Sequence, residues 1–263
     1  MSIQMSMVLF DGKPNLSVRE LRQTLSANWA DVPPATEESE QDVTLSLRIG
    51  VADVVVGLMP APVPWSDLEG PCATSILWPN AASTIREHKY HAIVTVSGEL
   101  SPIELSTLLT KVTAALMISS SEALGVFWTN AAMIVPKALF FDFSIKILPL
   151  GPPVSIWIDC RVGWAEDKAT SAGFTTGLES LGLMELETQR ATEPPSELRS
   201  RFEAIARYLL ENGPVIGDGH TIGESESEKI RVAHSHSAFG AKGTVMSLVY
   251  GPSAEKKPWW KRW

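Results

Sequence analysis

Apolar residues recur at helical spacing in three stretches of the chain. Within each stretch they fall three or four residues apart, which gives a helix one apolar face. Two of the stretches begin with the Ser-x-x-Glu spacing of a capping box, at Ser17–Glu20 and at Ser101–Glu104. The last stretch stops at an Asn-Gly-Pro triplet, which ends a helix. The pattern therefore predicts helices over residues 17–29, 101–118 and 196–212.

Shorter stretches in which apolar and polar residues alternate, or in which β-branched residues gather, predict strands. Pro79 opens one more helix, which we expect to run to about residue 88. The segment 35–42 contains four acidic residues and no basic one, and we interpret it as a solvated loop. The predicted strands lie at residues 5–10, 43–49, 53–58, 91–96, 126–128, 154–162, 184–189, 229–236 and 244–250.

The order of these elements defines the expected fold class. In the first half it is strand, helix, strand, strand, helix, strand, which is the order of a ferredoxin-like βαββαβ unit. A similar rhythm recurs in the second half. We therefore predict an α+β fold of two packed subdomains, with mostly antiparallel sheets and flanking helices. The expected boundaries are 1–100 for an N-terminal subdomain, 101–250 for a C-terminal subdomain and 251–263 for a basic, Trp-rich tail.

Composition narrows the classes of function. The chain has 22 Lys and Arg against 30 Asp and Glu, a formal net charge of −8. This excess of acid disfavours direct nucleic-acid binding and suits a basic partner. The N-terminus lacks the basic and apolar regions of a signal peptide, and no stretch reaches the ~18 apolar residues of a membrane helix. We therefore expect a cytoplasmic protein without a membrane span.

No stretch carries a recognised catalytic motif, so we expect no catalytic residue, no cofactor and no bound metal. Cys72 and Cys160 lie outside any CxxC pair, and we interpret both as reduced, buried thiols. The segment GPVIGDGHTIG, Gly213–Gly223, is rich in glycine but follows a helix. A phosphate-binding loop follows a strand and opens a helix, so this segment favours a structured turn.

Three histidines leave an enzymatic alternative open. His234 and His236 lie two residues apart on a predicted strand and therefore face the same way. With His220 they would supply the three ligands of a catalytic metal site. The other interpretation is that they are partly exposed residues on a polar strand face. A small hydrolase or metal-binding enzyme that uses these histidines is thus an alternative function.

Two acidic segments are candidate contacts for a partner. Carboxylates on exposed loops attract a basic protein and raise its association rate. The other interpretation is a solvated loop. The candidate partner-binding residues are Glu37, Glu38, Glu40, Asp42, Asp218, Glu224, Glu226 and Glu228.

Five stretches, which together extend over most of the chain, resemble a bacterial family. They are residues 59–82, 108–116, 173–188, 208–223 and 237–251. The family that they resemble is catalogued as domain of unknown function 4261. Proteins similar to this family occur beside secreted bacterial toxins, in particular type VI secretion effectors, and there look like immunity proteins.

The resemblance and the composition together point to one expected function. It is a non-enzymatic immunity protein that binds and neutralises a cognate toxin acting in the cytoplasm. The expected toxin is a nuclease, because nucleic-acid enzymes carry basic substrate grooves that an acidic inhibitor would cover. An adaptor of a secretion machine is a further alternative, besides the histidine enzyme.

Overall fold

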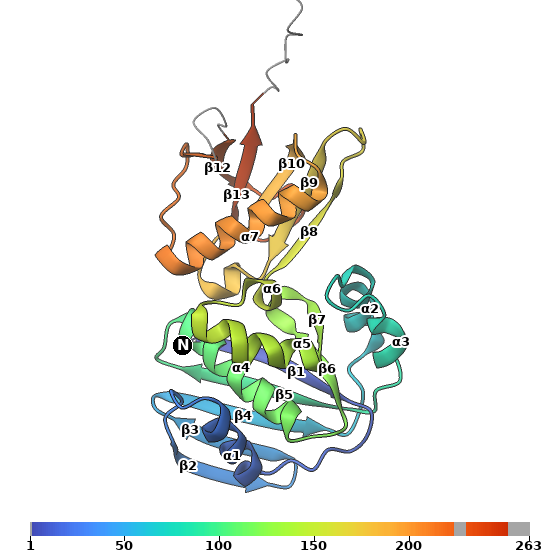
Figure 1. Cartoon of the computed structure of the whole chain (residues 1–263), viewed down its shortest axis with the longest axis vertical. Coiled ribbons are helices and arrows are strands. Elements are labelled where there is room, and N and C mark those ends of the chain that lie inside the picture. Colours follow the sequence, from blue (N-terminus) through green and yellow to red (C-terminus); the bar gives the residue numbers. More distant parts are fainter. Residues whose placement is uncertain (1, 224–229, 252–263) are drawn as a thin grey trace, which may run out of the picture. The chain divides into compact units, whose positions relative to one another are not determined.

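The computed structural model describes residues 2–223 and 230–251. Over this part of the chain it has an α+β fold with two sheets, as expected (Figure 1). The chain divides into two compact units. Unit 1 comprises the described residues up to Asp159 together with Thr176–Leu183, and unit 2 comprises Cys160–Thr175 and the described residues from Met184 onward.

Unit 1 is built on a sheet of seven strands within the described residues, in the order β2-β3-β4-β5-β1-β6-β7. Every neighbouring pair in this order is antiparallel. Its strands are β1 (Ser2–Phe10), β2 (Ala35–Gln41), β3 (Thr44–Ile49), β4 (Ala52–Met59), β5 (Tyr90–Gly98), β6 (Ala123–Trp128) and β7 (Met133–Pro136).

Helix α4 (Pro102–Ile118) packs against β1 and β5 and is buried along most of its length (Figure 1). Two of its buried polar residues have partners inside the unit: the hydroxyls of Thr113 and Ser6 lie 2.7 Å apart, and the Trp157 indole donates to Thr110 at 2.8 Å. The other helices of unit 1 are α1 (Val18–Asn28), α2 (Trp65–Thr74), α3 (Ala81–Ile85), α5 (Lys137–Asp142) and α6 (Val154–Trp157).

Unit 2 carries one long helix, α7 (Pro195–Asn212), and a sheet with the order β11-β12-β13-β10-β9-β8 over the described residues. β10 and β13 pair in parallel, whereas the pairs β9–β10, β11–β12 and β12–β13 are antiparallel. The strands are β8 (Asp159–Trp164), β9 (Ser171–Thr176), β10 (Leu186–Ala191), β11 (Thr221–Ile222), β12 (Ile230–His236) and β13 (Thr244–Tyr250).

Two expectations about the architecture were wrong. A ferredoxin-like unit places its third strand beside its first, but here β5 lies between β4 and β1. The cause is that α2 and α3 join β4 to its antiparallel neighbour and do not cross over another strand. The division of the chain also does not fall at residue 100, because α4 packs against the unit 1 sheet and β6 and β7 are two of its strands.

Three local features also differ from the elements that the sequence predicts. The acidic segment 35–42, expected as a loop, forms β2. The segment 154–162, expected as one strand, begins as the short helix α6 and continues as β8. Ser101 and Glu104 form the expected capping box, whereas the Ser17 side chain caps nothing. At α1 the backbone N–H of Val18 instead donates to Glu40 Oε2 at 2.9 Å.

Candidate functional site

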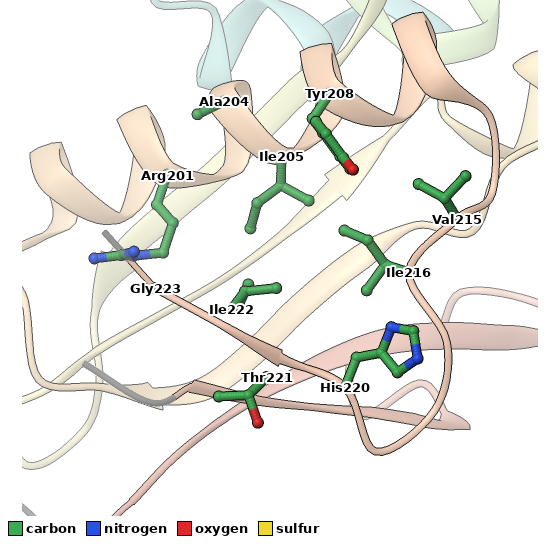
Figure 2. A pocket seen from close by; sticks show the side chains of 10 residues that line it. All are labelled: Arg201, Ala204, Ile205, Tyr208, Val215, Ile216, His220, Thr221, Ile222 and Gly223. Carbon is green, nitrogen blue, oxygen red and sulfur yellow. The ribbon is translucent and has the colours of Figure 1, made fainter. Parts of the chain in front are cut away.

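A pocket of about 450 Å³ lies within unit 2, between α7 and the segment that follows it (Figure 2). Apolar walls with a few polar groups are typical of small-molecule sites, which commonly range from ~300 to ~1,000 Å³. The large aliphatic residues of the lining are Ile205, Val215, Ile216 and Ile222, which come from both sides of the pocket. Tyr208 and His220 add polar groups.

The wall opposite α7 is shaped by a tight turn. Gly213 and Gly219 both adopt a φ of +79°, which favours glycine. The Gly217 N–H donates to His220 Nδ1 at 3.1 Å, and the His220 N–H donates to the Gly217 carbonyl at 3.2 Å. The Gly213–Gly223 segment is therefore the structured turn that the sequence predicts, and it holds the His220 ring.

Arg201 brings a charge to the pocket wall, and that charge is compensated inside unit 2. Its guanidinium binds both oxygens of Glu193 at 2.7–3.0 Å, and the two side chains are only 11% and 8% exposed. The Tyr250 hydroxyl donates to the same carboxylate at 2.6 Å. This cluster joins α7 to β13 and to the loop before α7.

The three histidines of the enzymatic alternative do not form a metal site. Over the part of the chain that the structure describes, no group of three His, Cys, Asp or Glu is arranged to hold an ion. His220 is tied to its own turn, whereas His236 lies exposed at the end of β12. The backbone N–H of His234 donates to Asp218 Oδ1 at 2.9 Å.

The first acidic segment lies on a strand and not on a loop. Glu37, Glu38 and Glu40 are exposed residues of β2, and Asp42 follows in the turn to β3 with a φ of +40°. Glu38 forms an ion pair with Arg22 at 3.0 Å, and Glu40 caps α1. Two of these four carboxylates therefore have a role inside unit 1.

The second acidic segment is only partly described. Asp218 is exposed and accepts the His234 N–H, so it joins the turn to β12. Glu224, Glu226 and Glu228 lie outside the described residues.

Burial shifts the pKa values of two groups in unit 1. Burial raises the pKa of the Cys72 thiol, which keeps the thiol protonated and unreactive. Burial also lowers the pKa of His88. The His88 Nε2 atom accepts the Val63 N–H at 2.8 Å, which fixes the loop before α2.

Sequence reasoning missed the α7 side of the pocket. Ile205 belongs to the apolar face of the predicted helix, and Tyr208 lies one turn further along. The glycine-rich turn directly after that helix was the available signal, because it brings the chain back toward the helix end.

Comparison with known proteins gives one match. Residues 174–249 match the model of a family described as a domain of unknown function, DUF4261. This supports the family that the sequence resembles, over a part of the chain that contains the pocket of Figure 2. No curated protein and no solved structure matched. Among the described residues, no helix is long and apolar enough to cross a membrane.

Proposed function

We propose that the protein is a non-enzymatic immunity protein that binds and neutralises a cytoplasm-acting bacterial toxin, a type VI secretion effector with nuclease activity. The observation that carries the proposal is the acidic edge of unit 1. Within the described residues β2 pairs only with β3, and all its residues after Ala35 are exposed. Such an edge offers a partner both backbone hydrogen bonds and negative charge.

The carboxylates of this edge are not equally available to a partner. Glu38 and Glu40 serve Arg22 and the start of α1. The side chains of Glu37 and Asp42 make no hydrogen bond or ion pair within the described residues. They are therefore the carboxylates that we assign to the partner.

A basic enzyme is the partner that this charge fits. A nuclease must carry Lys and Arg in its substrate groove to hold phosphates. A chain of net charge −8 gains association rate and specificity against such a groove. The resemblance to a family found beside secreted toxins supports the same class of partner.

The test is co-expression with the protein encoded beside this chain, scored by growth rescue and by a co-purifying complex. The variant combines Glu37→Lys with Asp42→Asn, because Asn tolerates the positive φ of Asp42. Its association rate should fall about tenfold at low salt, with a flatter salt dependence. Glu211→Lys combined with Glu197→Gln, two exposed positions on α7, changes the formal charge by the same amount and is the matched control.

Two results would contradict the proposal. An unchanged association rate and salt dependence in the β2 variant would show that the acidic edge does not contact the partner. A partner without nuclease activity would show that the assigned class of toxin is wrong.

A second candidate function, small-molecule binding, is favoured by the pocket of Figure 2. Native mass spectrometry of the purified protein would reveal a co-purified ligand. Ala204→Phe, which fills the pocket from α7, should then release it. Retention of the ligand in this variant would place it elsewhere.

A further inference from the structure

We propose that a groove over β8, β9 and β10 of unit 2 is the docking site for an arginine or lysine side chain of a partner protein. The proposal rests on the proposed function in taking the partner to be basic. The groove measures about 490 Å³ and lies wholly within unit 2. Its lining includes Trp164, Glu166, Ala172, Gln189, Ala238 and Phe239.

The chemistry of the lining selects a cation on an apolar stem. Trp164 and Phe239 remain 59% and 40% exposed, although they are large aromatic residues. Aromatic ring faces attract Lys and Arg and also cover their methylene stems. Glu166 is the charged residue of the lining, and its carboxylate can meet the cationic group.

The chain uses the same pairing for its own arginines. The Arg86 guanidinium lies 4.7 Å from the ring centre of Trp65. In unit 2 the Arg161 guanidinium lies 6.0 Å from the ring centre of Phe174, and Phe174 stacks on Phe239 with ring centres 5.1 Å apart. Phe239 therefore already belongs to an arginine–aromatic stack, which a partner's arginine would extend.

Phe239 is held in place by a buried carboxylate. Glu187 is only 3% exposed and accepts hydrogen bonds from Ser237 Oγ at 2.7 Å and from the Ala238 N–H at 3.1 Å. The Phe239 N–H in turn donates to Ser237 Oγ at 3.0 Å. These hydrogen bonds fix the backbone of the β12–β13 loop that carries the Phe239 side chain.

The turn after Trp164 is fixed by a second carboxylate. Asp167 Oδ1 accepts the N–H groups of Ala169 and Thr170, each at 2.9 Å, and Asp167 pairs with Arg190 at 2.9 Å. These hydrogen bonds, the one from the Ala169 backbone first, hold the Asp167 pKa well below its usual range. Aromatic anchors on ordered loops lose little entropy on binding, as interface hot spots require.

The test titrates the full chain with a synthetic peptide of alternating arginine and glycine, and with a peptide that has glutamine in place of arginine. The arginine peptide should bind and shift the indole N–H resonance of Trp164, which the spectrum of Trp164→Phe identifies. Trp164→Ala and Phe239→Ala should each weaken binding about tenfold, and Glu166→Gln about threefold. Val249→Ala, which trims a large apolar residue that is 44% exposed on β13 and lines neither pocket, is the control and should change nothing.

Equal binding of the two peptides would overturn the proposal, as would unchanged binding by Trp164→Ala and Phe239→Ala. A dimer of the free protein that dissociates in Trp164→Ala would also overturn it, because a second copy would then cover the groove. These outcomes are independent of the acidic edge. The β2 variant should bind the arginine peptide normally, and a partner without nuclease activity contradicts the proposed function without touching the groove.

Discussion

Glu37 on β2 and Glu187 on β10 are both strand glutamates, yet their surroundings differ. Glu37 is exposed on the edge of the unit 1 sheet, and its side chain makes no hydrogen bond or ion pair in the described part of the chain. Glu187 is 3% exposed and accepts hydrogen bonds from Ser237, Ala238 and Ser247. The acidic residues behind the net charge of −8 therefore include buried carboxylates that stabilise unit 2 and exposed carboxylates that can contact a partner.

The largest expected effect on the free energy of unfolding is at Glu193, a buried carboxylate of unit 2. Glu193→Gln removes the buried carboxylate that binds the Arg201 guanidinium at 2.7–3.0 Å and accepts the Tyr250 hydroxyl at 2.6 Å. Breaking one side of a buried ion pair costs ~3–5 kcal/mol, so the free energy of unfolding should fall by about that amount. Urea denaturation measures it. A loss below ~1 kcal/mol would show that the pair is not buried in solution.

Glu187→Gln should have the next largest effect. The amide places an NH2 group against donors from the β12–β13 loop, so at least one buried hydrogen bond is lost, at ~1–3 kcal/mol. Because this loop carries Phe239, the variant should also weaken arginine-peptide binding while Val249→Ala does not. Faster amide exchange confined to residues 237–243 would mark the positioning effect. Unchanged exchange there would contradict it.

The fold could be predicted where apolar spacing is regular. Helices α4 and α7 lie within two residues of their predicted bounds. Apolar residues that recur three or four positions apart form one face of a helix and do not fit a strand. β2 could not be predicted, since its sequence ATEESEQ is polar after Ala35 and its strand form depends on pairing with β3. The same Ser-x-x-Glu spacing forms a capping box at α4 but not at α1, where Glu40 supplies the acceptor from β2.

The candidate sites show the same limit. The turn at Gly213–Gly223 could be predicted, because its glycines and its place after a helix are local features. The groove could not be predicted, since Trp164 and Phe239 are far apart in the sequence. They come together only because the strands pair into a sheet and Glu187 holds the loop that carries Phe239. The arrangement of the three histidines could not be predicted for the same reason. Spacing puts His234 and His236 on one strand face, but only the fold decides where His220 lies.

A smaller effect on stability is expected at Glu40, which is exposed like Glu37 but accepts a hydrogen bond like Glu187. It is exposed on β2 but accepts the Val18 N–H at 2.9 Å. Loss of a helix N-cap costs ~1 kcal/mol, so Glu40→Ala should lower the free energy of unfolding by about that amount. Ser17→Ala should change it little, because the Ser17 side chain makes no capping bond. Chemical denaturation of both variants decides which residue caps α1, and the reverse order would contradict the assignment.

The smallest effect on stability is expected at Glu37. Glu37→Gln removes a charge that no group in the described residues engages, so the free energy of unfolding should stay within ~0.5 kcal/mol. If the acidic edge meets a basic partner, the same substitution should slow association with that partner, with little change in the dissociation rate. Glu211→Gln, which removes the same charge from an exposed position on α7, should leave both rates unchanged. Stopped-flow binding at low salt measures the rates. If Glu37→Gln destabilised the fold as much as Glu40→Ala, Glu37 would have to be grouped with the carboxylates that build the fold, and the comparison with Glu187 would fail.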